Sequence, residues 1–130
     1  DALTAWVAEE LKRHQRLVVT GDFTVAPEDR DVPDPEEWRE QILCSTPERD
    51  HLQALMATGL KDAFRLFDQP EKSFSWWDYR AAGFRRNRGL RIDLVLVSAA
   101  VAETCSAATI DLGPRRLEKP SDHAPVVALL

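Results

Sequence analysis

Apolar residues at the start of the chain recur at a spacing that predicts one helix followed by one strand. In residues 1–14 the apolar positions that share one helical stripe are Leu3, Trp6, Val7 and Leu11. Charged side chains occupy most of the remaining positions, which is typical of an amphipathic helix. The apolar run in residues 16–23 then predicts a short buried strand that ends at Gly21 and Asp22.

A second helix is predicted in residues 45–59 by residue types that commonly begin and end helices. Thr46 can cap the first turn, Pro47 suits the first helical position, and Gly59 suits the position after the last turn. The preceding segment, residues 25–43, is rich in Pro, Asp and Glu. This composition indicates a long loop, with a helical turn around Trp38.

The second half of the chain is dominated by predicted strands. Residues 73–79, 90–98 and 124–130 each predict a strand, with a short helix at 99–105 and a weak strand near Ile110. Helices and strands together predict an α/β fold with a largely buried sheet. In the strand of residues 90–98, Leu94 and Leu96 face one way and Val95 and Val97 the other. Both faces therefore need cover, and one face is expected to need a layer that this chain does not contain.

Composition narrows the class of protein. The chain has 130 residues, of which 44% are hydrophobic and 30% charged, as expected for one soluble globular domain. No apolar run is long enough to cross a membrane, so no membrane partner is expected. Cys44 and Cys105 lack metal-site spacing, which favours a reducing cytoplasm.

The charges are unevenly distributed. The net charge of −5 argues against a polyanionic partner. However, residues 80–91 contain five arginines and no acid, so the rest of the chain has a net charge of −10. Because the planar guanidinium matches phosphate oxygens, this arginine-rich stretch is a candidate phosphate-binding loop. A solvated basic loop is the alternative.

Acidic residues and one histidine lie at the ends of the predicted strands. Asp22 ends one strand, Asp93 lies on an apolar face of another, and Asp122 and His123 precede the last. A buried carboxylate needs a partner, and an aspartate that orients a histidine is a recurrent catalytic arrangement. The alternatives are that Arg91 or backbone amides satisfy Asp93 and that a turn surrounds Asp122. Clustered acids beside an arginine loop suit a hard cation such as Mg²⁺ and phosphodiester hydrolysis.

The motifs GDF, SWWDYR, NRGLRID and KPSDHAPV, in this order, resemble the exodeoxyribonuclease III family of the endonuclease/exonuclease/phosphatase superfamily. The resemblance extends from about Leu17 to the last residue. It implies a DNA repair nuclease that depends on Mg²⁺ or Mn²⁺ and acts on abasic sites, 3′ ends of duplex DNA and 3′-phosphates. It also implies the second half of a four-layered α/β sandwich, with a mostly antiparallel or mixed sheet and helices on one face.

The resemblance assigns roles to single positions. Asp22 matches an aspartate that activates water or protonates the leaving group, and Asp93 matches the acid that pairs with the catalytic histidine, His123. Asp122 matches a carboxylate near the metal, and Trp76 matches a tryptophan that packs against DNA near the lesion. The arginines that match the DNA-contacting loop are Arg80, Arg85, Arg86 and Arg88.

Two departures from the family pattern are expected to affect function. Thr24 stands in GDFT where the family has asparagine, and a threonine cannot both donate and accept over the same span, so low activity is expected. Residues 1–130 also match only the C-terminal half of the family's domain. This chain alone is therefore expected to be inactive, to retain no metal and to self-associate through an uncovered sheet face.

Two other functions remain open. A member of the same superfamily could hydrolyse a non-DNA phosphoester such as a phosphoinositide. A DNA-binding module with lapsed catalysis would also account for Thr24.

Overall fold

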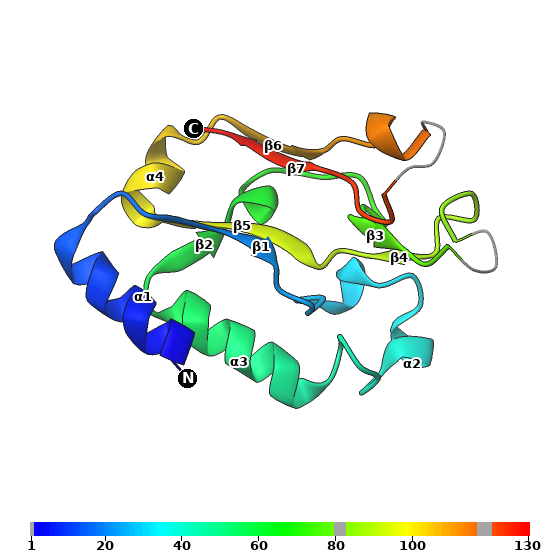
Figure 1. Ribbon diagram of the computed structural model, residues 1–130, viewed down its shortest axis with the longest axis horizontal. Coiled ribbons are helices and arrows are strands. Elements are labelled where there is room, and N and C mark those ends of the chain that lie inside the picture. Colours follow the sequence, from blue (N-terminus) through cyan, green and yellow to red (C-terminus); the bar gives the residue numbers. More distant parts are fainter. Residues whose placement is uncertain (1, 80–82, 117–120) are drawn as a thin grey trace.

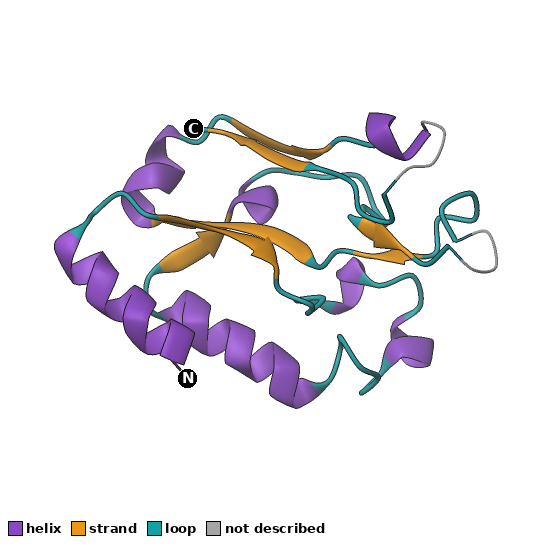
Figure 2. Cartoon of the chain, viewed as in Figure 1, coloured by secondary structure: helices purple, strands orange, loops and turns teal. Residues whose placement is uncertain are grey.

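A computed structural model describes residues 2–79, 83–116 and 121–130, with elements as labelled in Figure 1. The α-helices are α1 (Ala2–Arg13), α2 (Pro35–Trp38), α3 (Thr46–Ala57) and α4 (Ala99–Thr104). The strands are β1 (Val18–Asp22), β2 (Leu60–Asp62), β3 (Trp76–Trp77), β4 (Gly89–Leu90), β5 (Asp93–Ser98), β6 (Ala107–Ile110) and β7 (Val126–Leu129). The described 3₁₀ turns are η1 (Asp29–Asp31), η2 (Ala63–Leu66) and η4 (Gly113–Arg116). Loops dominate the end of the molecule that holds β3 and β4 (Figure 2).

Strand β5 is the centre of an antiparallel sheet with the order β1-β5-β2. Helices α1 and α3 lie against one face of this sheet (Figure 1) and bury Val7 and Leu55 against Leu94 and Leu96. Full burial of each such side chain stabilises the fold by about 1.5–3 kcal/mol. The predicted α/β fold, with antiparallel pairing and helices on one face, is confirmed.

The apolar stripe predicted for α1 is only partly buried. Val7 is 2% exposed and Leu11 packs beside it, whereas Leu3 is 39% and Trp6 63% exposed. Successive helical residues are rotated by about 100°, so the turn that brings Val7 to the sheet directs Trp6 to solvent. Of the predicted stripe, Val7 and Leu11 therefore pack against the sheet, whereas Leu3 and Trp6 do not.

The second face of β5 is covered by this chain itself, contrary to expectation. Strands β6 and β7 form a separate antiparallel pair that packs over it (Figure 1), with Ala108 and Ala128 near Val95 and Val97. Alanines allow this ribbon to approach closely, and Val97 is 0% exposed. The uncovered apolar surface instead includes Val127, Leu129 and Leu130, which are 41–57% exposed.

Helix α3 begins with a capping box one residue earlier than predicted. The Ser45 hydroxyl accepts a hydrogen bond from the Glu48 amide, and the Glu48 carboxylate accepts from the Ser45 amide. Thr46 is not the N-cap, because its hydroxyl donates to Glu40 at 2.6 Å. Gly59 follows the helix at φ 128°, a conformation that favours glycine.

The strand predicted in residues 73–79 is much shorter, because β3 contains only Trp76 and Trp77. It pairs with β4, where Gly89 allows a close approach: a Cβ there would lie 2.5 Å from the Trp76 carbonyl oxygen. Strand β2, which the pattern did not predict, completes the central sheet. Among the described residues, no helix combines the length and apolar character needed to cross a bilayer.

Candidate active site

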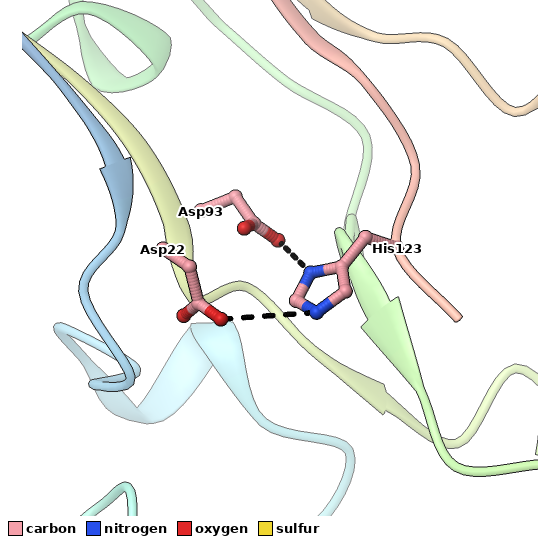
Figure 3. A group of neighbouring side chains, drawn as sticks. All are labelled: Asp22, Asp93 and His123. Carbon is pink, nitrogen blue, oxygen red and sulfur yellow. Dashed lines mark hydrogen bonds and ion pairs between the residues drawn. The ribbon is translucent and has the colours of Figure 1, made fainter. Parts of the chain in front are cut away.

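Three chain segments bring Asp22, Asp93 and His123 together at one rim of the fold (Figure 3). Asp22 ends β1 and lies directly opposite Asp93, the first residue of β5, in antiparallel register. His123 precedes β7 and is held opposite Trp76 by an isolated β-bridge. The strand ends therefore position all three side chains, as the sequence predicted.

The histidine lies between the carboxylates. His123 Nδ1 is 2.8 Å from Asp93 Oδ2, and His123 Nε2 is 3.7 Å from Asp22 Oδ2 (Figure 3). Two carboxylates on directly opposite residues repel each other, and a proton on the imidazole relieves that repulsion. The Asp93 bond fixes the ring and leaves Nε2 to face Asp22, an arrangement suited to proton transfer.

The site favours the protonated form of His123. Partial burial on its own would lower the pKa of His123, but the hydrogen bond to Asp93 and the charges of Asp93, Asp122 and Asp22 together raise it above 6.5. The folded state therefore binds this proton more tightly than the unfolded chain. Protonation stabilises the fold fully below the ordinary pKa, and this stabilisation is lost as pH rises through the raised value.

Asp93→Asn is expected to lower the pKa of His123, because it removes the charged hydrogen-bond partner. The substitution should also destabilise the protein more below pH 6.5 than at high pH, where the imidazole is neutral in both proteins. Histidine NMR titration and urea unfolding at both pH values would measure these effects. Asp68→Asn, at an exposed position outside the site, is the control. An unchanged His123 titration in Asp93→Asn would contradict the expectation.

Asp122 lies beside the site with its carboxylate already engaged. Its Oδ2 accepts a hydrogen bond from Trp76 Nε1 at 3.1 Å, and its Oδ1 is 3.9 Å from His123 Nε2. Among the described residues, the group whose ligand atoms all lie within 4.8 Å of one another is Asp22, Asp93 and His123. The metal role of Asp122 stays a prediction. Its hydrogen bond with Trp76 links this tryptophan to the acidic rim, the strand ends that carry Asp22, Asp93 and His123.

Thr24 follows the rim that holds Asp22 and has an unfavourable backbone conformation. Its φ is 53°, in the left-handed region that β-branched residues avoid. Its amide donates to Asp22 Oδ1 at 2.9 Å, and its hydroxyl donates to the Phe23 carbonyl at 2.7 Å. Asparagine tolerates this region better, so the strain falls on the position where the chain departs from the family motif.

The arginine-rich stretch is only partly available for a ligand. Arg85 and Arg86 are exposed, and Arg80 lies outside the described residues. Arg88 Nη2 contacts both carboxylate oxygens of Glu37 at 2.7 and 2.8 Å, which raises the pKa of Arg88. The sequence pattern did not predict this pair, because 51 residues separate its members.

Arg91 and Arg115 are buried and have structural contacts. Arg91 does not pair with Asp93, because it bonds to Asp31 at 2.7 Å and to Asp62 at 2.6 Å. Arg115 lies 4.6 Å from the Phe84 ring centroid, and its Nη1 donates to the Ser121 carbonyl at 2.8 Å. Arg115 thereby anchors the loop that leads to His123. The residue spacing in the sequence predicted neither the contacts of Arg91 nor those of Arg115.

The sequence and the fold match known nucleases. The profile described as the Endonuclease/Exonuclease/phosphatase family matches residues 1–123. Exodeoxyribonuclease III of Haemophilus influenzae is 41% identical to this chain, and the alignment covers 97% of this chain and 50% of that protein.

Two solved structures extend this likeness. A 3′ phosphatase from Neisseria, bound to a product DNA hairpin, is 48% identical with a TM-score of 0.95, over 98% of this chain and 50% of that one. An AP endonuclease from Archaeoglobus fulgidus is 30% identical with a TM-score of 0.85, over 98% of this chain and 52% of that one. This chain therefore spans about half the length of the relatives it matches.

Proposed function

The chain belongs to the endonuclease/exonuclease/phosphatase family, and on that premise we propose that the complete protein is a metal-dependent DNA repair nuclease. Its proposed substrates are abasic sites, 3′ ends of duplex DNA and 3′-phosphates. The observation that carries the proposal is the 2.8 Å contact between His123 and Asp93, with Asp22 on the other side of the same ring.

In the proposed reaction, these side chains orient the phosphate and move protons. Asp93 holds the imidazole by its Nδ1, so that Nε2 can contact an oxygen of the scissile phosphate. Asp22, exposed at the rim, either accepts a proton from the attacking water or delivers one to the leaving oxygen. Because the pKa of His123 is raised, its protonated form can balance negative charge that develops on the phosphate.

The donor atoms at the rim fit a divalent cation. The carboxylate oxygens of Asp22 and Asp93 could hold Mg²⁺ or Mn²⁺, with Asp122 beside them, while His123 keeps its proton and faces the phosphate. When bound, the ion would supply positive charge that neutralises the phosphate oxygens. These few carboxylates leave most of the coordination to water or to other residues, so we expect weak metal retention by this chain alone.

The proposed DNA surface consists of Trp76 and the arginines of residues 80–88. An aromatic ring can pack against bases while guanidinium groups hold phosphates, and Arg85 and Arg86 are exposed. The bond between Trp76 and Asp122 would couple DNA contacts to the acidic rim. A cytoplasmic location, where such DNA is found in bacteria, completes the proposal.

Glu37→Gln is expected to strengthen DNA binding by releasing Arg88 for a phosphate. One additional phosphate contact should steepen the logarithmic dependence of affinity on salt by about 0.9. Fluorescence anisotropy of the complete protein on duplex DNA, with EDTA and several salt concentrations, measures this slope.

Glu36→Gln is the matched control for that experiment, because it removes the same charge from α2 but releases Arg39. Equal slopes for the two variants would rule out a DNA contact through Arg88.

Cleavage assays on the complete protein distinguish the alternative functions. A nuclease should cut a duplex with one abasic site in Mg²⁺ and not in EDTA. A phosphatase for another phosphoester would spare that duplex but hydrolyse a soluble phosphomonoester. A lapsed DNA-binding module, suggested by Thr24, would bind the duplex and hydrolyse neither. Failure to cut this duplex, together with failure to act on the 3′ end or a 3′-phosphate of duplex DNA, would refute the proposed function.

We propose that these 130 residues form the second half of the family's sandwich. The exposed apolar residues on β7 support this proposal, because such surfaces are commonly covered by another layer. Leu129 is 57% exposed and points away from the β5 sheet together with Val127.

The chain alone is therefore expected to self-associate, and Leu129→Lys should shift it towards the monomer. A charge on that face would have to be desolvated in any contact between copies. Sedimentation velocity over a concentration series measures the change. Ile42→Lys, at a position 77% exposed in another segment, should leave the association unchanged. A wild-type chain that stays monomeric throughout would refute self-association.

A further inference from the structure

Ser75 is a buried residue that is bonded to chain segments on both sides of the candidate active site. It precedes β3 and is 0% exposed. Its hydroxyl oxygen accepts hydrogen bonds from the amides of Ile92 and Asp93, each at 3.1 Å. Its carbonyl oxygen accepts a hydrogen bond from the amide of Ala124 at 2.7 Å. Ser75 therefore bonds to the backbone amide of Asp93 and to the backbone amide of the residue that follows His123.

These bonds lie where the chain passes from one strand pair to another. Strand β4 pairs with β3, and β5 pairs with β1 and β2, so residues 91 and 92 form the crossing between the pairs. A buried amide must find an acceptor. The hydroxyl of Ser75 has two lone pairs and accepts from both neighbouring amides. A side chain thus takes the place of a strand partner at the start of β5.

We infer that Ser75 is a positioning residue that sets the separation of the Asp93 carboxylate and the His123 imidazole. The hydroxyl fixes the backbone from which the Asp93 side chain extends, and the carbonyl fixes the residue after His123. The 2.8 Å contact between the two side chains depends on both. The effect of Ser75 on catalysis rests on the function proposed above, but its effect on the contact does not.

Ser75→Ala in the complete protein tests the inference, with Ser98→Ala as a matched control. Ser98 is 2% exposed at the other end of β5, and its hydroxyl also joins two chain segments, accepting from the Leu17 amide and donating to the Gln15 carbonyl. With ¹⁵N-labelled histidine, the hydrogen-bonded Nδ1 proton of His123 should give a strongly deshielded NMR signal. We expect this signal in the wild type and in Ser98→Ala, and its loss in Ser75→Ala.

Activity provides a second measurement. A small displacement of reacting groups can lower the rate by about 10- to 100-fold, so kcat should fall by that factor in Ser75→Ala while KM changes little. Ser75→Thr keeps the hydroxyl and should restore kcat. If Ser75→Ala does not fold, Ser75→Cys keeps the same side-chain connectivity with a larger sulfur that is a weaker acceptor, and the same losses are expected.

The inference is overturned if the folded variant keeps both the deshielded signal and the wild-type kcat. It is also overturned if Ser98→Ala loses both to the same extent. If the wild-type protein cleaves no DNA, the proposed function fails, while the NMR comparison still decides the role of Ser75.

Discussion

Thr24→Asn is expected to raise the rate of abasic-site cleavage by the complete protein by about 10²–10³-fold, the usual contribution of one side chain that stabilises the transition state. Thr24 follows the acidic rim, and its hydroxyl already donates to the Phe23 carbonyl at 2.7 Å. An asparagine side chain reaches further and presents both a donor and an acceptor to the phosphate. Single-turnover cleavage of a duplex with one abasic site measures the change.

The same substitution should stabilise the fold, because Thr24 has a φ of 53°. A β-branched residue in this region costs about 1–2 kcal/mol, and asparagine costs less. Thr24→Gly separates the two effects: glycine removes the backbone strain but supplies no amide. We expect both variants to unfold at higher urea concentration and only Thr24→Asn to gain activity. An equal rate for Thr24→Asn and the wild type would refute the catalytic part of this expectation.

His123→Gln is expected to lower cleavage by about 10²–10⁴-fold, as for loss of a general acid or base. His123 contacts Asp93 at 2.8 Å and faces Asp22 at 3.7 Å. Glutamine can keep a hydrogen bond to Asp93 but cannot carry the proton. The loss should therefore appear in kcat, with DNA affinity little changed, and both can be measured on the same duplex.

The control for His123→Gln is His14→Gln. His14 lies directly after α1. Its only described ion pair is with Glu10 of that helix, at 3.7 Å. At high pH, where the imidazole of His123 is neutral and adds no charge-dependent stability, both variants should unfold at similar urea concentrations, and only His123→Gln should lose activity. Wild-type kcat in a folded His123→Gln protein would remove the chemical basis of the proposed nuclease.

The acidic rim could be predicted from sequence because each of its members lies at a strand end. Asp22, Asp93 and His123 are marked by short motifs, and antiparallel pairing places Asp22 opposite Asp93. The partner of Asp93 was also predictable, because a carboxylate on an apolar face needs one nearby. These inferences used local pattern and the alternation of side chains along a strand.

The parts that could not be predicted depend on contacts between distant segments. The pairing of Arg88 with Glu37 and of Arg91 with Asp31 and Asp62 cannot be read from spacing. Cover for the second face of β5 also came from an unexpected source. Ala108 lies in a segment with only a weak strand pattern, and no pattern showed that this segment and the predicted last strand, which contains Ala128, would pack together over β5. Periodicity indicates that a face is buried, but it does not identify what buries it.

The arginines of this chain should respond differently to ionic strength. Arg91 is 1% exposed between two carboxylates, where dissolved ions screen charges only weakly. Arg85 and Arg86 are exposed, and any phosphate they hold competes directly with salt. Concentrated salt would therefore free the proposed enzyme from its DNA while its interior stays assembled. Washing with salt and returning to dilute buffer should recover the protein ready to bind again.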